Sequence, residues 1–263
     1  MPPLRRALPL LLGAATLLTV VLLGCGSGSG QSGSTPHDQQ SRVRFFNGFI
    51  PQAGQSSTLS VTNQGAAMTG PVGISFAEFL PTHTYLSVGR SAFQPMATGA
   101  GLAGPVPAQA PIHLDGAPTA YTLALVGQAG QSGDLKPQIL VIPDLPQVMA
   151  FIPDFQMALR VINLSPGLGP ITLLNEQEVL NSNMTNIPYG YDPALNPYIL
   201  VPTRPQLHLS LRDASHPSQD LPVAGNWTSP NLLNGHTYTL YVYGQRGNAA
   251  QPLSATIVED AVP

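Results

Sequence analysis

The stretch "YTLALVGQAG" at residues 121–130 returns almost unchanged as "YTLYVYGQRG" at residues 238–247. In both copies, branched or aromatic residues occupy every second position ahead of a glycine. This alternation predicts a β-strand, and the glycine predicts where the strand ends. We therefore expect one strand in each copy, with Tyr121 and Tyr238 at equivalent positions.

Three further blocks repeat in the same order, at offsets of 116, 116 and 113 residues. The pairs are "VRFFN" (43–47) with "LRVIN" (159–163), "ILVIPD" (139–144) with "ATIVED" (255–260), and "ISFAEF" (74–79) with "IPYGYD" (187–192). Short strands separated by turns, repeated over about 105 residues, are typical of β-sandwiches. The sequence thus predicts an all-β protein with two tandem Ig-like β-sandwich domains.

The predicted domains span residues 42–146 and 157–260, and residues 147–156 join them. This joint, "QVMAFIPDFQ", is apolar, so we expect the two domains to pack on each other. The composition agrees with a β fold, because 28 prolines and 26 glycines among 263 residues disfavour long helices.

The only cysteine, Cys25, follows an uncharged run, "ALPLLLGAATLLTVVLLG", that is preceded by Arg5 and Arg6. This order is that of an export signal. "LLGC" (22–25) resembles the lipobox of bacterial lipoproteins. The resemblance implies a signal peptide at 1–24, lipid attachment at Cys25, and an exported protein anchored in the cell envelope, at the outer membrane or cell surface. The alternatives are a buried free thiol and an uncleaved membrane-spanning anchor.

Residues 25–41 combine the cysteine with a Gly/Ser-rich segment that lacks the apolar residues needed for a core. We interpret this segment as a flexible tether. Without Arg5 and Arg6 the chain keeps eight basic and thirteen acidic residues, a net charge of −5. No basic patch is visible, and we predict no nucleic-acid partner.

Several motifs resemble the bacterial domain-of-unknown-function family 4397. In the second copy they are "LRVINLSPG" (159–167), "IPYGY" (187–191), "YILV" (198–201) and "GHTYTLYVYG" (235–244); in the first they are "RVRFFNG" (42–48), "YLSV" (85–88) and "YTLALVG" (121–127). The resemblance covers about residues 42–260. It implies an exported, often lipid-anchored, Ig-like sandwich protein, and it supplies no catalytic residues.

Within "LLNGHTYTL", the residues Leu232, Gly235 and Tyr238 form an L-x-x-G-x-x-Y pattern. The pattern resembles the tyrosine corner of Greek-key sandwiches, in which the ring packs in the core and the hydroxyl bonds a backbone group just upstream. We predict a structural role for these three residues. Tyr121 lies at the corresponding place in the first copy, but its turn is longer.

Motifs that carry chemistry are sparse. "GAGLAG" (99–104) fits a dinucleotide fingerprint only formally, because the prolines that follow forbid the required helix. The six histidines form no H-x-H or H-E-x-x-H pair, and His113 with Asp115 would leave a zinc site short of ligands. The neighbours Glu259 and Asp260 are expected at a solvated strand edge. We predict no catalytic residue, no cofactor and no metal.

Tyr189, Tyr191, Tyr198 and Trp227 give the second copy an aromatic bias. Aromatic rings on loops bind sugars or partner proteins, whereas rings in a sandwich more often fill its core. The leading hypothesis is a non-enzymatic cell-envelope lipoprotein for adhesion, ligand binding or envelope organisation. Its candidate partners are the membrane, a cell-surface glycan and an envelope protein. The alternatives are an enzyme or accessory protein acting on envelope glycans, and a structural subunit of an envelope complex.

Overall fold

The computed structural model describes most of the chain beyond residue 40. The described residues are 41–63, 66–67, 73–81, 85–88, 94–108, 120–144, 152–176, 178–203, 207–225 and 227–260. The predicted signal peptide, Cys25 and nearly all of the predicted tether lie outside them, as do residues 147–151 of the predicted joint. Contacts between residues divide the chain into Met1–Thr35 and one compact unit, Pro36–Pro263.

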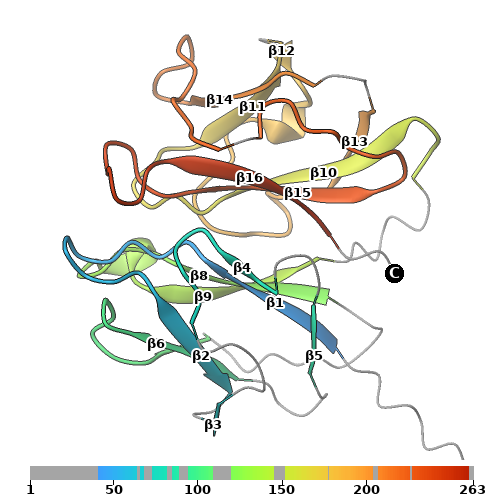
Figure 1. The fold of residues 1–263 in the computed structure, drawn as a ribbon. Coiled ribbons are helices and arrows are strands. Elements are labelled where there is room, and N and C mark those ends of the chain that lie inside the picture. Colours follow the sequence, from blue (N-terminus) through green and yellow to red (C-terminus); the bar gives the residue numbers. More distant parts are fainter. Residues whose placement is uncertain are drawn as a thin grey trace, which may run out of the picture. The chain divides into compact units, whose positions relative to one another are not determined.

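The described residues form sixteen β-strands in four sheets, with two short 3-10 helices, η1 (Gly133–Leu135) and η2 (Ser182–Met184) (Figure 1). The all-β prediction is therefore confirmed. Two sheets belong to residues 41–143 and two to residues 156–259, which we call the first and second halves. The predicted domain boundaries and the Ig-like classification stay predictions.

In the first half, one sheet has the order β4-β1-β8-β9, with β5 also paired to β1, and the other has the order β3-β2-β6-β7. The strands of the first sheet are β1 (Ser41–Asn47), β4 (Phe79–Leu80), β5 (Leu86–Val88), β8 (Ala120–Val126) and β9 (Gln138–Pro143). Those of the second are β2 (Leu59–Asn63), β3 (Ala66–Ala67), β6 (Pro95–Gly99) and β7 (Val106–Pro107).

The second half has sheets ordered β13-β10-β15-β16 and β12-β11-β14. Their strands are β10 (Gln156–Asn163), β13 (Ile199–Pro202), β15 (Thr237–Tyr243) and β16 (Ser254–Glu259), then β11 (Ile171–Asn175), β12 (Glu178–Val179) and β14 (Leu209–Asp213). The long parallel pair recurs in register, because Val43 faces Tyr121 in the first half and Leu159 faces Tyr238 in the second. The repeat read from the sequence is thus a repeat of strand pairing.

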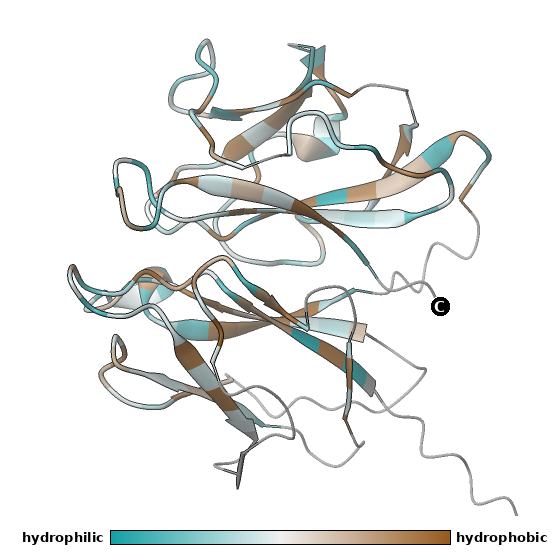
Figure 2. Cartoon of the chain, viewed as in Figure 1, coloured by the Kyte–Doolittle hydropathy of each residue, from teal (hydrophilic) through white to brown (hydrophobic). Residues whose placement is uncertain are grey.

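Each half buries its own apolar core between its two sheets. Hydrophobic and hydrophilic residues alternate along β1 (Figure 2), as expected for a strand with two different faces. In the first half, Leu123 and Leu125 of β8 pack with Leu59 of β2 and Ala97 of β6, which belong to the facing sheet. The second half repeats this arrangement around Leu240 of β15. Residues of two sheets meeting in one core make a β-sandwich.

The alternation predicted at 121–126 is confirmed, and both faces of the strand are buried. Leu123 and Leu125 enter the first core, whereas Ala124 and Val126 enter a third apolar cluster. That cluster combines residues of both halves, and the expected packing of the halves on each other is present there. Its buried members are Phe46, Phe79, Ala124, Val126 and Ile142 from the first half, and Ile162, Leu164, Tyr241 and Tyr243 from the second.

Glycines end the two repeated strands for a steric reason. Gly127 and Gly244 have φ values of +100° and +82°, and a Cβ on them would lie 2.3 Å and 2.1 Å from a backbone carbonyl oxygen. Only glycine fits both the left-handed conformation and the close approach. "GAGLAG" runs from Gly99, the last residue of β6, through the turn before β7 (Val106–Pro107).

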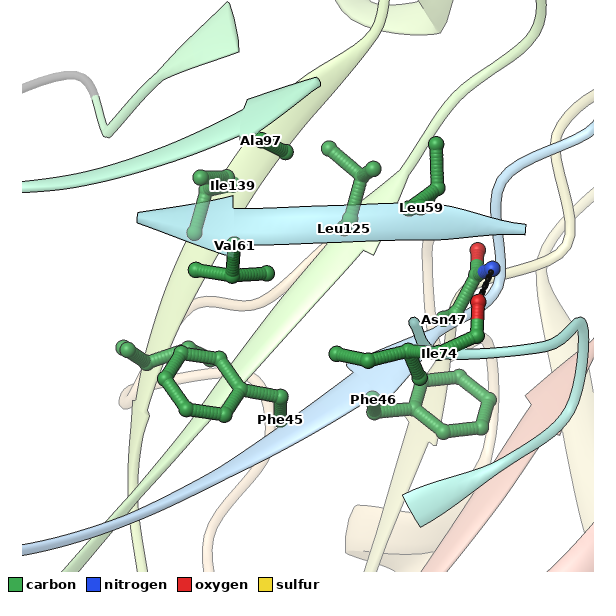
Figure 3. A pocket seen from close by; sticks show the side chains of 10 residues that line it. Phe45, Phe46, Asn47, Leu59, Val61, Ile74, Ala97, Leu125 and Ile139 are labelled. Atoms are coloured by element: carbon green, nitrogen blue, oxygen red, sulfur yellow. Dashed lines mark hydrogen bonds between the residues drawn. The ribbon is translucent and has the colours of Figure 1, made fainter. Parts of the chain in front are cut away.

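The first core contains a small gap lined by residues of both its sheets (Figure 3). The gap has a volume of about 10 Å³, and its accessible lining is apolar. The one amide beside it, that of Asn47, donates to the carbonyl oxygens of Ile74 at 2.9 Å and Ser57 at 2.6 Å. A dry space smaller than one water molecule is a packing defect and not a ligand site.

Candidate functional site

Two arginines connect the halves reciprocally. Arg44 on β1 lies 2.6 Å from a carboxylate oxygen of Asp260, which follows β16 in the other half. Arg160 on β10 lies 2.8 Å from a carboxylate oxygen of Asp144, which follows β9. Both arginines and both aspartates occupy equivalent positions of the repeat, 116 residues apart. Each half therefore offers its arginine to the other half's aspartate, as in an isologous interface.

In each half, one threonine joins the arginine to the aspartate of the same half. The Nε atoms of Arg44 and Arg160 donate to Thr122 and Thr239, both at 2.7 Å. Thr122 donates in turn to Asp144, and Thr239 donates to Asp260 at 2.6 Å. The remaining guanidinium nitrogens reach backbone carbonyl oxygens, of Glu259 from Arg44 at 3.0 Å and of Pro143 from Arg160 at 2.7 Å. We call Arg44, Arg160, Asp144, Asp260, Thr122 and Thr239 the ionic lock.

Tyrosines complete the surroundings of the lock. Tyr198 donates to Asp260 at 2.7 Å and Tyr85 donates to Asp144 at 3.1 Å. Their rings lie under the arginines, with the Arg160 guanidinium carbon 4.4 Å from the Tyr198 ring centre and that of Arg44 4.9 Å from Tyr85. Hydrogen bonds and cation–π contacts offset the desolvation of buried charges.

The lock is buried, and burial acts against the charged forms of Arg44 and Asp144. The side chains of Asp144 and Asp260 are fully buried, and those of the arginines are 4% exposed or less. Burial opposes the charged guanidinium of Arg44, but Asp144, Tyr241 and Asp260 together raise its pKa. Burial also raises the pKa of Asp144 to about 6, although Arg44 and Arg160 act in the opposite direction. These carboxylates hold the two halves together and are closed to a substrate.

The lock corrects one sequence-based expectation. Asp260 was expected at a solvated edge beside Glu259, but it is only 1% exposed and paired with Arg44. Sequence reasoning also missed Arg44, Arg160 and Asp144. A signal was available, because an arginine within a strand and an aspartate directly after a strand both recur at an offset of 116 residues.

The predicted tyrosine-corner residues lie together. The Tyr238 hydroxyl accepts a hydrogen bond from the backbone N–H of Leu233 at 3.0 Å, and the ring packs in the second core. Leu232 packs against the same core, and Gly235 has a φ of +78° that suits the turn before β15. Burial raises the pKa of Tyr238. The proposed lipid-attachment residue, Cys25, lies outside the described residues.

The other sequence candidates are dispersed. Trp227 is 2% exposed in the second core, and Tyr189 and Tyr191 pack against the cluster between the halves, so these rings fill space. Among the described residues, no group of three or more His, Cys, Asp or Glu side chains is arranged to hold a metal ion. His236 contacts Glu259, while His113 and Asp115 fall outside the described residues.

A cleft of about 650 Å³ lies between the loops of the two halves. Residues 50–55 and 128–129 form the wall from the first half, and residues 245, 248, 250 and 251 form the wall from the second. Its polar lining consists of side-chain amides: Gln52, Gln55, Gln128, Gln245, Asn248 and Gln251. The lining includes no charged residue, so the cleft suits a neutral polar ligand.

The cleft lies at one end of the strands. Residues 50–55 follow β1, residues 128–129 follow β8, and the remaining lining residues belong to the loop between β15 and β16. Ser41, the first described residue, lies at the other end of β1. Because β1 and β8 are parallel, their carboxyl ends lie together and opposite Ser41. The loops on the left of Figure 1 and the start of β1 on its right show this separation. Seven residues of β1 correspond to roughly 20 Å.

No family model and no curated protein matches this chain. Among solved structures, the chain is similar to the crystal structure of a putative cell adhesion protein from Bacteroides ovatus, with 13% identity over 85% of this chain and 99% of that one. The TM-score is 0.22, so this likeness carries no functional argument. No helix among the described residues is long and apolar enough to span a membrane.

Proposed function

We propose that this chain is a non-enzymatic lipoprotein of the cell envelope, anchored through Cys25, whose β-sandwich body binds a ligand or surface partner. The separation of Ser41 from the cleft carries the proposal. A chain tethered through residues 25–41 enters the body at the amino end of β1, and the cleft opens at the carboxyl end. A membrane-anchored body can thus turn its cleft away from the membrane.

The ionic lock supports a binding role in place of catalysis. General acid–base chemistry requires titratable groups that a substrate can approach. Asp144 and Asp260 are fully buried and already hydrogen-bonded to threonine and tyrosine hydroxyls. They fix the relative position of the halves, and hence of the two walls of the cleft. A pre-formed cleft loses less conformational entropy on binding.

The anchor is tested by comparing cells that express the wild type with cells that express Cys25→Ala. We expect the wild-type body to stay with the membrane fraction and to be digested by protease added to intact cells. We expect Cys25→Ala to leave the membrane fraction. A variant bound as firmly as the wild type would show that lipid attachment at Cys25 is wrong. Protection of the wild type from external protease would exclude a role at the cell surface.

The non-enzymatic assignment has its own test. The full chain is incubated with envelope polysaccharides, and new reducing ends are measured. We expect none above the level of a heat-denatured sample. New reducing ends that require folded protein would overturn the proposal in favour of a glycan-active enzyme.

A further inference from the structure

We infer that the cleft lined by residues 50–55, 128, 129, 245, 248, 250 and 251 binds an uncharged oligosaccharide. This inference rests on the proposed ligand-binding function and names the class of ligand. It begins with the lining, because each side-chain amide offers both a donor and an acceptor. Sugar hydroxyl groups likewise donate and accept, so an amide-lined wall can match them whichever way they point.

The cleft contains amides that the fold itself does not use. Gln251 is only 9% exposed, and its side-chain amide forms no hydrogen bond with the described part of the chain. The amides of Gln52 and Gln55 are exposed on the opposite wall and also form none there. The buried polar side-chain atoms without a partner do not include those of Gln251, so its amide, like those of Gln52 and Gln55, reaches solvent. A ligand hydroxyl would take the place of water at these amides.

One side-chain amide and several backbone hydrogen bonds hold the walls in place. Asn248 accepts from the backbone N–H groups of Ala250 at 3.0 Å and Gln251 at 3.1 Å, which fixes the loop between β15 and β16. On the first-half wall, Ile50 bonds Gly127 and Ala129 through its backbone, at 3.0 Å and 2.9 Å. The cleft is therefore formed without a ligand, and side chains such as that of Gln251 remain available to one.

The two walls meet at equivalent residues of the repeat. Gln128 and Gln245 both follow the glycine that ends the repeated strand, and the Gln245 amide donates to Gln128 across the cleft at 3.4 Å. This hydrogen bond is long and exchangeable. A ligand seated between the halves would take both amides as partners, so its binding depends on both copies of the repeat.

The chemistry of the lining disfavours charged ligands and favours sugars over peptides. Anions are bound through Arg or Lys, and cations through carboxylates, and the lining contains neither. Between the amides lie small apolar surfaces, from Pro51, Ala53, Ala129 and Ala250. These suit the C–H faces of sugar rings and offer no deep pocket for a large peptide side chain. The volume lies in the range of ligand sites, about 300–1,000 Å³.

The test uses the full chain, purified in detergent, on an array of neutral gluco- and manno-oligosaccharides, their uronic-acid counterparts and uncharged seven-residue peptides. We expect binding to neutral oligosaccharides that changes less than twofold between 50 mM and 500 mM salt. The double variant Gln128→Ala/Gln251→Ala should weaken it about tenfold or more. Gln52→Ala/Gln55→Ala, which alters only exposed side chains, should weaken it while leaving the thermal unfolding curve unchanged.

Gln219→Ala, an exposed amide outside the cleft, is the matched control and should bind like the wild type. Equal binding by the cleft variants and the wild type would overturn the inference. So would binding only to uronic acids, binding only to peptides, or no binding to any sugar. The purified chain is not attached to a membrane, so this result is independent of the Cys25 experiment. If the oligosaccharide test fails, the assignment to the cell envelope is unaffected. If the Cys25 experiment fails, the inference about the cleft is unaffected.

Discussion

The guanidinium of Arg44 and the carboxylate of Asp260 lie 2.6 Å apart although 216 residues of chain separate them. The equivalent pair is Arg160 of the second half and Asp144 of the first half, which lie 2.8 Å apart. Together the two pairs place two positive and two negative charges in a buried, nearly neutral group. The stability of the packed halves should depend on every member of that group.

Replacing Arg160 by Met should lower the free energy of unfolding by about 3 kcal/mol, because the buried Asp144 loses its partner at 2.8 Å and keeps only Arg44, 3.4 Å away. Urea unfolding followed by tryptophan fluorescence measures the change. The control is Arg212→Met, since the ion pair of Arg212 with Asp220 is partly exposed and should contribute at most about 1 kcal/mol. Equal effects of the two substitutions would mean that the ionic lock adds little to stability.

The raised pKa of Asp144 predicts an unusual pH dependence. Burial raises this pKa from 3.8 to about 6, so between these values the folded chain binds a proton that the unfolded chain does not. The contribution of Asp144 to stability is therefore fully present below about pH 4 and is lost as the pH rises through 6. Unfolding free energies of the wild type and Asp144→Asn at pH 4.5, 5.5 and 7.0 isolate this contribution.

We expect the wild type to gain stability relative to Asp144→Asn as the pH falls over that range. Carboxylates outside the ionic lock contribute equally to both proteins and cancel in the difference. Parallel pH profiles would show that Asp144 titrates alike in the folded and unfolded chains. A difference of opposite sign would show that the arginines outweigh burial and lower the pKa.

Replacing Tyr238 by Phe should cost about 1 kcal/mol, the contribution of one hydrogen bond, because the Leu233 N–H loses its acceptor. Thermal and urea unfolding measure it. Leu233→Ala serves as the control, since that side chain is 50% exposed and its backbone N–H is retained. An unchanged unfolding curve for Tyr238→Phe would contradict the tyrosine-corner interpretation.

Replacing Gly244 by Ala should destabilise the chain by more than the same change at Gly54. Both glycines have φ near +80°, so both substitutions carry the conformational cost of a left-handed residue, about 1 kcal/mol. At Gly244 the new Cβ would also lie 2.1 Å from the carbonyl oxygen of Pro252, whereas at Gly54 no atom lies within 4 Å. Calorimetric melting of the two variants separates the clash from the conformational cost. Equal melting temperatures would contradict the predicted clash at Gly244.

Much of the fold was predictable because its determinants are local. The alternation of Tyr121, Leu123 and Leu125 with smaller or polar residues marks a strand by its period of two, and Gly127 marks the end of that strand. The recurrence of the pattern around Tyr238 predicted a repeat, and the structure repeats the parallel pairing in the same register. Such signals need only neighbouring residues.

The ionic lock and the cleft were not predictable in this way. An aspartate such as Asp260 directly after a strand is expected at a solvated strand edge, since no residue near it in the chain is basic. Its partner Arg44 belongs to the other half, and only the docking of the halves brings the two side chains together and removes water from them. The cleft likewise combines amides of three loops, and nothing in the sequence marks them as neighbours until the fold brings Gln128 and Gln245 together.

The sequence by itself determined the all-β class, the repeat and the inward faces of the paired strands, because alternation and turn residues act within a few positions of the chain. The tertiary structure alone decided the role of the opposite face. Thr122 and Tyr241, on that face in the two halves, are buried because each half covers the other. Burial of charge and closure of a cleft arise from that packing, which depends on contacts more than a hundred residues apart.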